Sequence, residues 1–126
     1  MPQTSYGPLY QTLLNNVAEV RFVRRRQLPG LGPVRRMLCT NNSNLLTSPN
    51  GRIVLNYKTP AQSLKYNPAQ KNLIITWDIL MQDFRNISLD DCELIRSFPP
   101  TDEFWNFFNE TFYPMTTQQK VAYMQA

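Results

Sequence analysis

Arginine side chains are concentrated in the first part of this 126-residue chain. Residues 1–52 contain seven arginines and one acidic residue, a net charge of +6, whereas residues 53–126 contain six basic and eight acidic residues, a net charge of −2. The guanidinium group is a planar fork that binds a phosphate through two hydrogen bonds at once. Such an uneven charge indicates an anionic partner for one part of the protein.

The arginine cluster falls on a predicted β-hairpin. Residues 18–26 begin with alternating apolar and polar side chains, residues 28–33 contain two glycines and two prolines typical of a turn, and residues 34–40 return as a second strand. Several arginine forks on a two-stranded ribbon predict binding to a nucleic-acid backbone. The alternatives are an acidic protein surface as partner, and a solvated sheet edge that charge protects from aggregation. The predicted binding residues are Arg21, Arg24, Arg25, Arg26, Arg35, Arg36 and Arg52.

Side chains that commonly perform acid–base or nucleophilic chemistry are scarce. The chain has no histidine and no GxSxG, P-loop or glycine-rich phosphate motif. Cys39 and Cys92 without histidine make a poor zinc site, and we expect buried free thiols in a reducing cytosol, with a single disulfide as the alternative. The acidic cluster of Asp90, Asp91 and Glu93 is typical of a solvated turn, with a metal or acid–base role as the alternative. The sequence therefore predicts a protein that is not an enzyme and uses no cofactor or metal.

A second β-hairpin is predicted over residues 71–88, an apolar run rich in β-forming side chains followed by a partner strand. Met81 and Gln82 occupy the position of a two-residue turn. This register sets Asp78 opposite Arg85, in a structural cross-strand ion pair worth about 0.2–1 kcal/mol.

The fifteen aromatic residues of the chain either enlarge its core or face a partner. Trp77 lies in the middle of an apolar run and is expected in the core. Tyr57 and Tyr66 flank a long polar loop predicted over residues 59–70, where we expect them to pack against the protein, with base stacking as the alternative.

The segment after Pro100 is strongly aromatic. Thr101 is suited to cap a helix that ends at Pro114, and a short last helix follows. We expect the aromatic helix to close the open end of the fold, with a docking surface for another protein as the alternative, because aromatic side chains dominate interface anchors. The predicted docking residues are Phe104, Trp105, Phe108 and Phe112.

Apolar spacing predicts the remaining elements. Residues 8–16 recur at helical intervals and predict an amphipathic helix, and residues 41–50 predict a short helical turn or loop. Residues 51–57 (GRIVLNY) and residues 92–98 predict two further strands.

Together the elements predict one domain of the mainly β, α+β class. An SH3-like antiparallel barrel of about five strands is expected over residues 18–98, with the helix of residues 1–17 packed on it and a helical tail over residues 99–126. The sequence has no uninterrupted run of 18 apolar residues, so no membrane span is predicted. The first residues do not have the pattern of a secretory signal.

Four short segments carry a family resemblance: VRFVRR from Val20, RRMLCT from Arg35, LIITWDI from Leu73 and FRNISLDDCELI from Phe84. They resemble the small SH3-like, Sm-like β-barrel proteins related to WYL domains that are common in tailed bacteriophages. The chain departs from that pattern in a longer insertion over residues 41–70 and in its aromatic tail.

The resemblance implies a barrel fold and a phage protein acting in the host cytoplasm or carried in the virion. Related WYL domains are similar to regulatory modules that bind ligands or nucleic acid through basic residues, and Arg35, Arg36 and Arg85 match basic positions of the pattern. No catalytic residue carries over. The resulting hypothesis is a non-enzymatic phage accessory protein that binds nucleic acid through its arginine hairpin. The alternative is a protein-interaction module, using the aromatic tail, that modulates a host enzyme such as RNA polymerase or a defence protein, or that belongs to the virion; a homo-oligomer is compatible with both.

Overall fold

The computed structural model describes residues 6–23, 33–58, 73–88 and 92–125. No helix within these ranges is long and apolar enough to cross a membrane. The loop predicted over residues 59–70 lies outside them.

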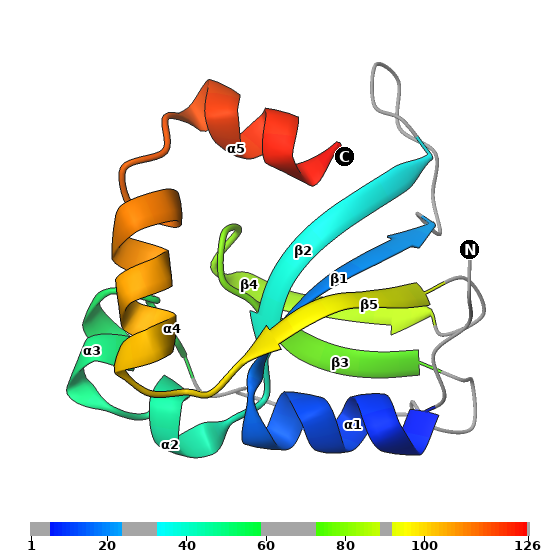
Figure 1. The fold of residues 1–126 in the computed structure, drawn as a ribbon, viewed down its shortest axis with the longest axis horizontal. Coiled ribbons are helices and arrows are strands. Elements are labelled where there is room, and N and C mark those ends of the chain that lie inside the picture. The colour runs from blue at the N-terminus through cyan, green and yellow to red at the C-terminus, as the bar shows by residue number, and fades with distance from the viewer. Residues whose placement is uncertain (1–5, 24–32, 59–72, 89–91, 126) are drawn as a thin grey trace.

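One antiparallel sheet of five strands organises the described residues (Figure 1). β1 (Val17–Val23) and β2 (Val34–Thr40) form the first predicted hairpin, and β3 (Leu73–Asp78) and β4 (Asp83–Ser88) form the second. β5 (Cys92–Phe98) pairs with β1, so that the strand order is β4-β3-β2-β1-β5. The predicted antiparallel α+β architecture is therefore confirmed.

The sheet curls without closing into a ring. β2 and β3 pair at only two positions, Cys39 with Asp78 and Thr40 with Trp77, so the two hairpins diverge beyond this joint. β4 also approaches β1, although two strands separate them in the sheet order. No ladder joins β4 to β5 among the described residues, so these two strands are the edges of an open sheet.

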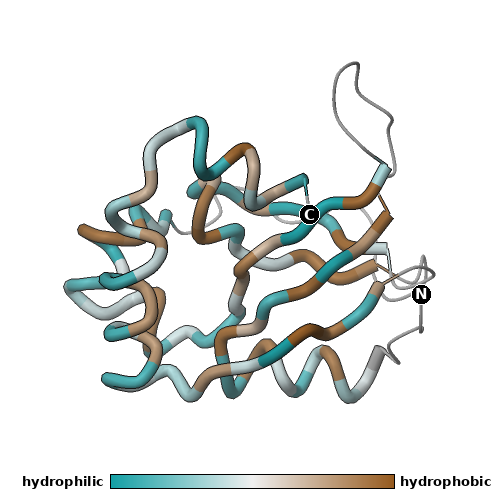
Figure 2. Tube along the Cα trace, turned by 45° about the horizontal axis from the view of Figure 1, so that its top comes forward, coloured by the Kyte–Doolittle hydropathy of each residue, from teal (hydrophilic) through white to brown (hydrophobic). Residues whose placement is uncertain are grey.

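An aliphatic cluster lies between the sheet and α1 (Tyr6–Asn15), close to the helix predicted over residues 8–16. Successive side chains of a strand point to opposite faces of the sheet, and hydrophobic residues recur along the strands in Figure 2. The cluster consists of Leu9, Leu13, Ala18, Val20, Phe22, Met37, Cys39, Ile74, Ile87 and Cys92.

A second, aromatic cluster fills the space between the sheet and the other helices. These helices are α2 (Ser43–Leu46), α3 (Pro49–Ile53), α4 (Asp102–Phe107) and η3 (Phe108–Phe112). Trp77 is buried there, as predicted, and Tyr57 packs edge-on against it with ring centroids 5.1 Å apart. α5 (Thr117–Met124), red in Figure 1, lies over β2.

The aromatic helix after Thr101 continues from α4 into a π-helical turn, η3. The amide of Tyr113 donates to the carbonyl oxygen of Phe108 over 2.9 Å, a bond that spans five residues rather than four. Phe104, Phe108 and Phe112 are all buried. The helix therefore packs against the sheet through the aromatic cluster, whereas its predicted role of closing the open end of a barrel stays a prediction.

The prediction of a strand over residues 51–57 is wrong, because this segment begins within α3. The Ser48 side chain caps the helix by accepting from the amide of Gly51 over 3.0 Å, and Pro49 occupies the first turn, where its missing N–H costs nothing. A side chain at Gly51 would place its Cβ 2.1 Å from the carbonyl oxygen of Leu45, so glycine permits the close contact between α2 and α3.

The prediction that Asp78 lies opposite Arg85 in a cross-strand ion pair is also wrong. Four residues, 79–82, connect β3 to β4 instead of two, and Asp78 therefore lies opposite Asp83 while Arg85 lies opposite Thr76. Gln82 ends this connection with φ of 57°, in the left-handed region. Arg85 instead donates to Asp83 over 3.0 Å in an exposed ion pair.

Candidate anion-binding site

Two arginines face each other across the first hairpin. Arg21 of β1 lies directly opposite Arg36 of β2, and both side chains are half-buried. Directly opposed residues of an antiparallel pair have Cβ atoms about 4.5–5.5 Å apart, where like charges destabilise the sheet. We call Arg21 and Arg36 the arginine pair.

The arginine pair has no acidic partner among the described residues. Glu93 lies opposite Arg21 in the β1–β5 ladder, but no ion pair joins the two side chains. The Nε atoms of Arg21 and Arg36 are enclosed and have no hydrogen-bond partner in the described part of the chain. An enclosed donor without an acceptor costs about 1–3 kcal/mol, and the arginine pair contains two such donors among the described residues.

Tyr123 of α5 provides the surface on which Arg36 rests. The guanidinium carbon of Arg36 lies 4.8 Å from the centre of the Tyr123 ring, a cation–π contact. The Tyr123 hydroxyl donates to Glu19 over 2.7 Å, and burial, followed by this bond to a carboxylate, raises the pKa of Tyr123. Arg36 therefore rests on a ring that Glu19 holds in place.

Glu19 anchors this arrangement from within the sheet. Its carboxylate is buried and also accepts a hydrogen bond from Arg96 over 3.4 Å. The guanidinium of Arg96 in turn lies 4.5 Å from the centre of the Phe107 ring and 5.2 Å from that of Phe98. The acid is thus bound to a tyrosine on one side and an arginine on the other, and does not neutralise the arginine pair.

Arg35, although next in sequence to Arg36, forms a buried ion pair with Asp78. The other oxygen of Asp78 accepts from the amides of Leu80 and Met81, each over 3.1 Å, so the same carboxylate holds the β3–β4 connection. Burial raises the pKa of Asp78, and the opposing effect of Arg35 is smaller. Because its charge is matched within the fold, Arg35 is a structural residue and does not join the arginine pair.

The remaining predicted nucleic-acid-binding residues do not extend the pair. Arg52 lies in α3, far from the β1–β2 hairpin (Figure 1), and its Nε donates to the carbonyl oxygen of Thr47 over 3.2 Å. The prediction that Arg52 lies in a strand is wrong, because its segment is helical. Arg24, Arg25 and Arg26 lie outside the described residues.

The predicted docking residues of the aromatic tail belong mainly to the core. Phe104, Phe108 and Phe112 are buried in the aromatic cluster, and Trp105 is half-buried against it. Phe104, Phe108 and Phe112 are 0%, 6% and 1% exposed, so only a small part of each ring is accessible from outside.

The predicted thiols lie inside the aliphatic cluster. Cys39 and Cys92 are buried and not joined by a disulfide. Burial raises the pKa of Cys39, and it raises that of Cys92 to about 11, so both remain protonated and unreactive near neutral pH. Asp90, Asp91 and Tyr66 lie outside the described residues. Within the described ranges, no three residues of the metal-binding types gather as ligands.

Sequence reasoning did not identify the residues that organise the site. Glu19 carried a partial signal, because strand alternation puts it on the same face as Arg21. Tyr123 carried none, since its contact with Glu19 joins positions 104 residues apart. No family model, curated protein or solved structure matches the chain.

Proposed function

We propose that the protein is not an enzyme and that it binds nucleic acid by holding backbone phosphate with the arginine pair. The observation that carries the proposal is the direct opposition of Arg21 and Arg36, with no acidic partner among the described residues. A phosphate between the two forks would replace repulsion with two charge-assisted interactions.

The enclosed Nε atoms support the same reading. Each Nε–H forms, with a neighbouring Nη–H, one edge of the guanidinium fork, and that edge lacks an acceptor among the described residues. Half-buried arginine side chains need only rotate toward solvent to present this edge to a phosphate. Binding would therefore satisfy donors that the protein alone leaves without an acceptor.

We further propose that the chain is a small SH3-like barrel protein of the tailed-phage type acting in the host cytoplasm. The curled sheet and the two hairpins support this proposal, and the described residues of the segments that carry the resemblance lie mainly in β1, β2, β3, β4 and β5. A barrel fold alone does not define an activity, so the binding proposal depends on the arginine pair.

The test is a fluorescence-anisotropy titration of a labelled DNA duplex, its single strand and the matching RNA at several salt concentrations. We expect Arg21→Ala and Arg36→Ala each to weaken binding and to reduce the slope of log affinity against log salt by about one. Arg52→Ala removes the same charge from α3 and serves as the matched control, with little change expected.

Two results would contradict the proposal. One is an affinity for all three nucleic acids that does not respond to salt, since phosphate contacts release counterions. The other is an equal loss of affinity in Arg52→Ala and in the two variants of the arginine pair, which would indicate general attraction to a basic protein.

A further inference from the structure

We propose that helix α5 is an autoinhibitory lid on the arginine pair: Tyr123 holds Arg36 while the lid is closed, and a bound phosphate releases it. This regulation rests on the proposed function, because the lid acts on the same phosphate site. Opening of α5 can be measured without nucleic acid, so the lid and the phosphate site can be contradicted separately.

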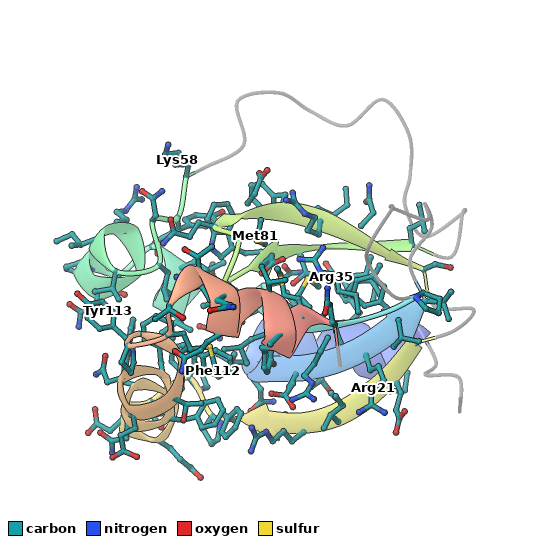
Figure 3. All side chains as sticks on the ribbon, turned by 90° about the horizontal axis from the view of Figure 1, so that it is seen from above. Arg21, Arg35, Lys58, Met81, Phe112 and Tyr113 are labelled. Atoms are coloured by element: carbon teal, nitrogen blue, oxygen red, sulfur yellow. The ribbon has the colours of Figure 1, made fainter. Side chains whose placement is uncertain are left out.

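α5 contacts one arginine of the pair and not the other. The centre of the Tyr123 ring lies 4.8 Å from the guanidinium carbon of Arg36. No ion pair or cation–π contact joins Arg21 to α5 within the described ranges. Figure 3, which looks down on α5, shows Arg35 near the end of this helix and Arg21 farther along the hairpin, clear of it. α5 therefore acts on the pair through Arg36.

The contact with Tyr123 competes with phosphate for Arg36. The Nε–H of Arg36 is enclosed and has no acceptor among the described residues. A phosphate oxygen can reach this donor when Arg36 turns toward solvent or when α5 moves aside, and either change separates the guanidinium from the Tyr123 ring. The closed lid thus weakens phosphate binding without changing the charge of the pair.

Few contacts hold α5 on the sheet, and no residue of the helix is buried. Besides the cation–π contact, the Tyr123 hydroxyl donates to Glu19 over 2.7 Å, and the Tyr123 ring packs edge-on against Phe112 with centroids 4.9 Å apart. The Met124 sulfur lies 3.8 Å from an Arg35 nitrogen. Segments with little buried apolar surface open locally at a free energy well below that of global unfolding. Loss of the cation–π contact should therefore shift α5 toward the open form.

α5 can move as one body, because its first turn is capped by its own residues. The Thr116 side chain accepts from the amide of Gln119 over 3.2 Å, and the Gln119 side chain accepts from the amide of Thr116 over 2.9 Å, which completes a capping box. Pro114 and Met115 lie between this cap and η3. The helix can thus leave the sheet by rotation at these two residues and keep its own hydrogen bonds.

Binding and opening are linked in both directions. If closing of α5 weakens phosphate binding by a given factor, bound phosphate weakens closing by the same factor. A partly desolvated cation–π contact accounts for a factor of about five to ten. The lid therefore predicts that nucleic acid exposes α5 to a protease, whereas a ligand that simply covered this surface would protect it.

The test uses trypsin, because Lys120 in α5 is the only lysine or arginine after Arg96. Cleavage at Lys120 removes the end of the helix, and its rate follows the open fraction when opening and closing are fast relative to cleavage. We expect a saturating concentration of the DNA or RNA used in the anisotropy titration to speed this cleavage about fivefold. Mass spectrometry of the shortened chain measures the rate.

Tyr123→Ala should raise the affinity for the same nucleic acids about fivefold and should speed cleavage in their absence. Because loss of the Tyr123 hydroxyl frees Glu19 to approach the arginine pair, the substitution is also compared within a Glu19→Gln background, where the same increase is expected. Tyr113→Ala truncates an exposed tyrosine outside α5 and is the matched control, with no change expected in either measurement.

Three outcomes would overturn the lid alone. They are an affinity of Tyr123→Ala that does not rise in either background, cleavage at Lys120 that bound nucleic acid leaves unchanged or slows, and equal effects of Tyr113→Ala and Tyr123→Ala. Absence of salt-dependent binding in both the wild type and Tyr123→Ala would instead overturn the phosphate site, and the lid with it.

Discussion

Helix α4 with η3 and helix α5 both pack on the sheet, but the contacts that hold them differ. The continuous helix of α4 and η3 has three buried phenylalanines, Phe104, Phe108 and Phe112, whereas α5 has no buried residue. α5 is held through Tyr123, which contacts Glu19, Arg36 and the edge of the Phe112 ring, and through Met124, whose sulfur lies 3.8 Å from an Arg35 nitrogen.

The two kinds of contact have different roles: one stabilises the fold, and the other orients α5 on the sheet. Apolar burial is non-directional and scales with area, so the aromatic contacts supply stability without fixing one geometry. Hydrogen bonds and cation–π contacts are weaker but directional. We therefore expect substitutions under α4 and η3 to unfold the protein, and substitutions under α5 to change the candidate binding site first.

The largest effect is expected for Phe104→Ala. This side chain is fully buried, and removing it leaves a cavity that should lower the free energy of unfolding by about 3–5 kcal/mol. Urea denaturation measures the loss. Tyr113→Ala, which truncates an exposed ring of the same helical segment, should change stability by no more than about 0.5 kcal/mol. Comparable losses in the two variants would contradict the assignment of stability to the buried ring.

A loss of about 3 kcal/mol is expected for Asp78→Ala, because it leaves the Arg35 guanidinium buried without its counter-charge. Asp83→Ala breaks an exposed ion pair of the same type and should cost no more than about 1 kcal/mol. Replacing both members of the buried pair, in Arg35→Met/Asp78→Leu, should restore much of the loss. If the double variant is less stable than Asp78→Ala, the ion pair stabilises the fold by more than the neutralisation of its two charges.

Tyr123→Phe should lower the free energy of unfolding by about 1.5 kcal/mol, since it removes one hydrogen bond to the buried carboxylate of Glu19. The ring beneath Arg36 is kept, so the effect isolates the hydroxyl. Tyr113→Phe provides the matched control at an exposed position, where no loss is expected. If Tyr123→Phe left the free energy of unfolding unchanged, α5 would be held by apolar contact, and its contrast with α4 would disappear.

The smallest effect concerns pH and a residue outside both helices. Burial raises the pKa of Cys92 from its ordinary value of 9.0 to about 11. The Cys92 thiol of the unfolded chain therefore loses its proton at a lower pH than that of the folded protein. The free energy of unfolding should therefore fall as pH rises from about 9 toward 11. Cys92→Ala should reduce this slope without abolishing it, because burial also raises the pKa of Cys39 and of Tyr123. A slope that is the same in Cys92→Ala and in the wild type would contradict the contribution of Cys92.

Local pattern was sufficient to predict most of the sheet. The alternation in the first hairpin and the β-rich run before Asp78 gave strands that the structure confirms, and β5 coincides with the predicted residues 92–98. The error at residues 51–57 was avoidable, because Ser48 followed by Pro49 is a helix-start signal that outweighs the short β-like run after it.

The candidate site was predictable only in part. Composition indicated arginines on a hairpin, but it could not tell that Arg35 is neutralised while Arg36 is not, since Asp78 lies 43 residues away. That distinction depends on the pairing of β2 with β3, which no local pattern encodes. Aromatic content likewise does not distinguish core from interface, because burial depends on what the helix packs against.

The π-helical turn makes this protein sensitive to a change in the number of residues rather than in their type. Phe104, Phe108 and Phe112 are spaced by four, and in a regular α-helix two such steps rotate by about 80° in total. The wider turn closed by the Phe108–Tyr113 bond rotates less per residue, which returns Phe112 to the buried line. A single-codon deletion within residues 109–111, which are all exposed, would thus keep every core side chain and still misalign the rest of the helix. We therefore expect natural variants of this segment to tolerate exchanges at its exposed positions far better than insertions or deletions.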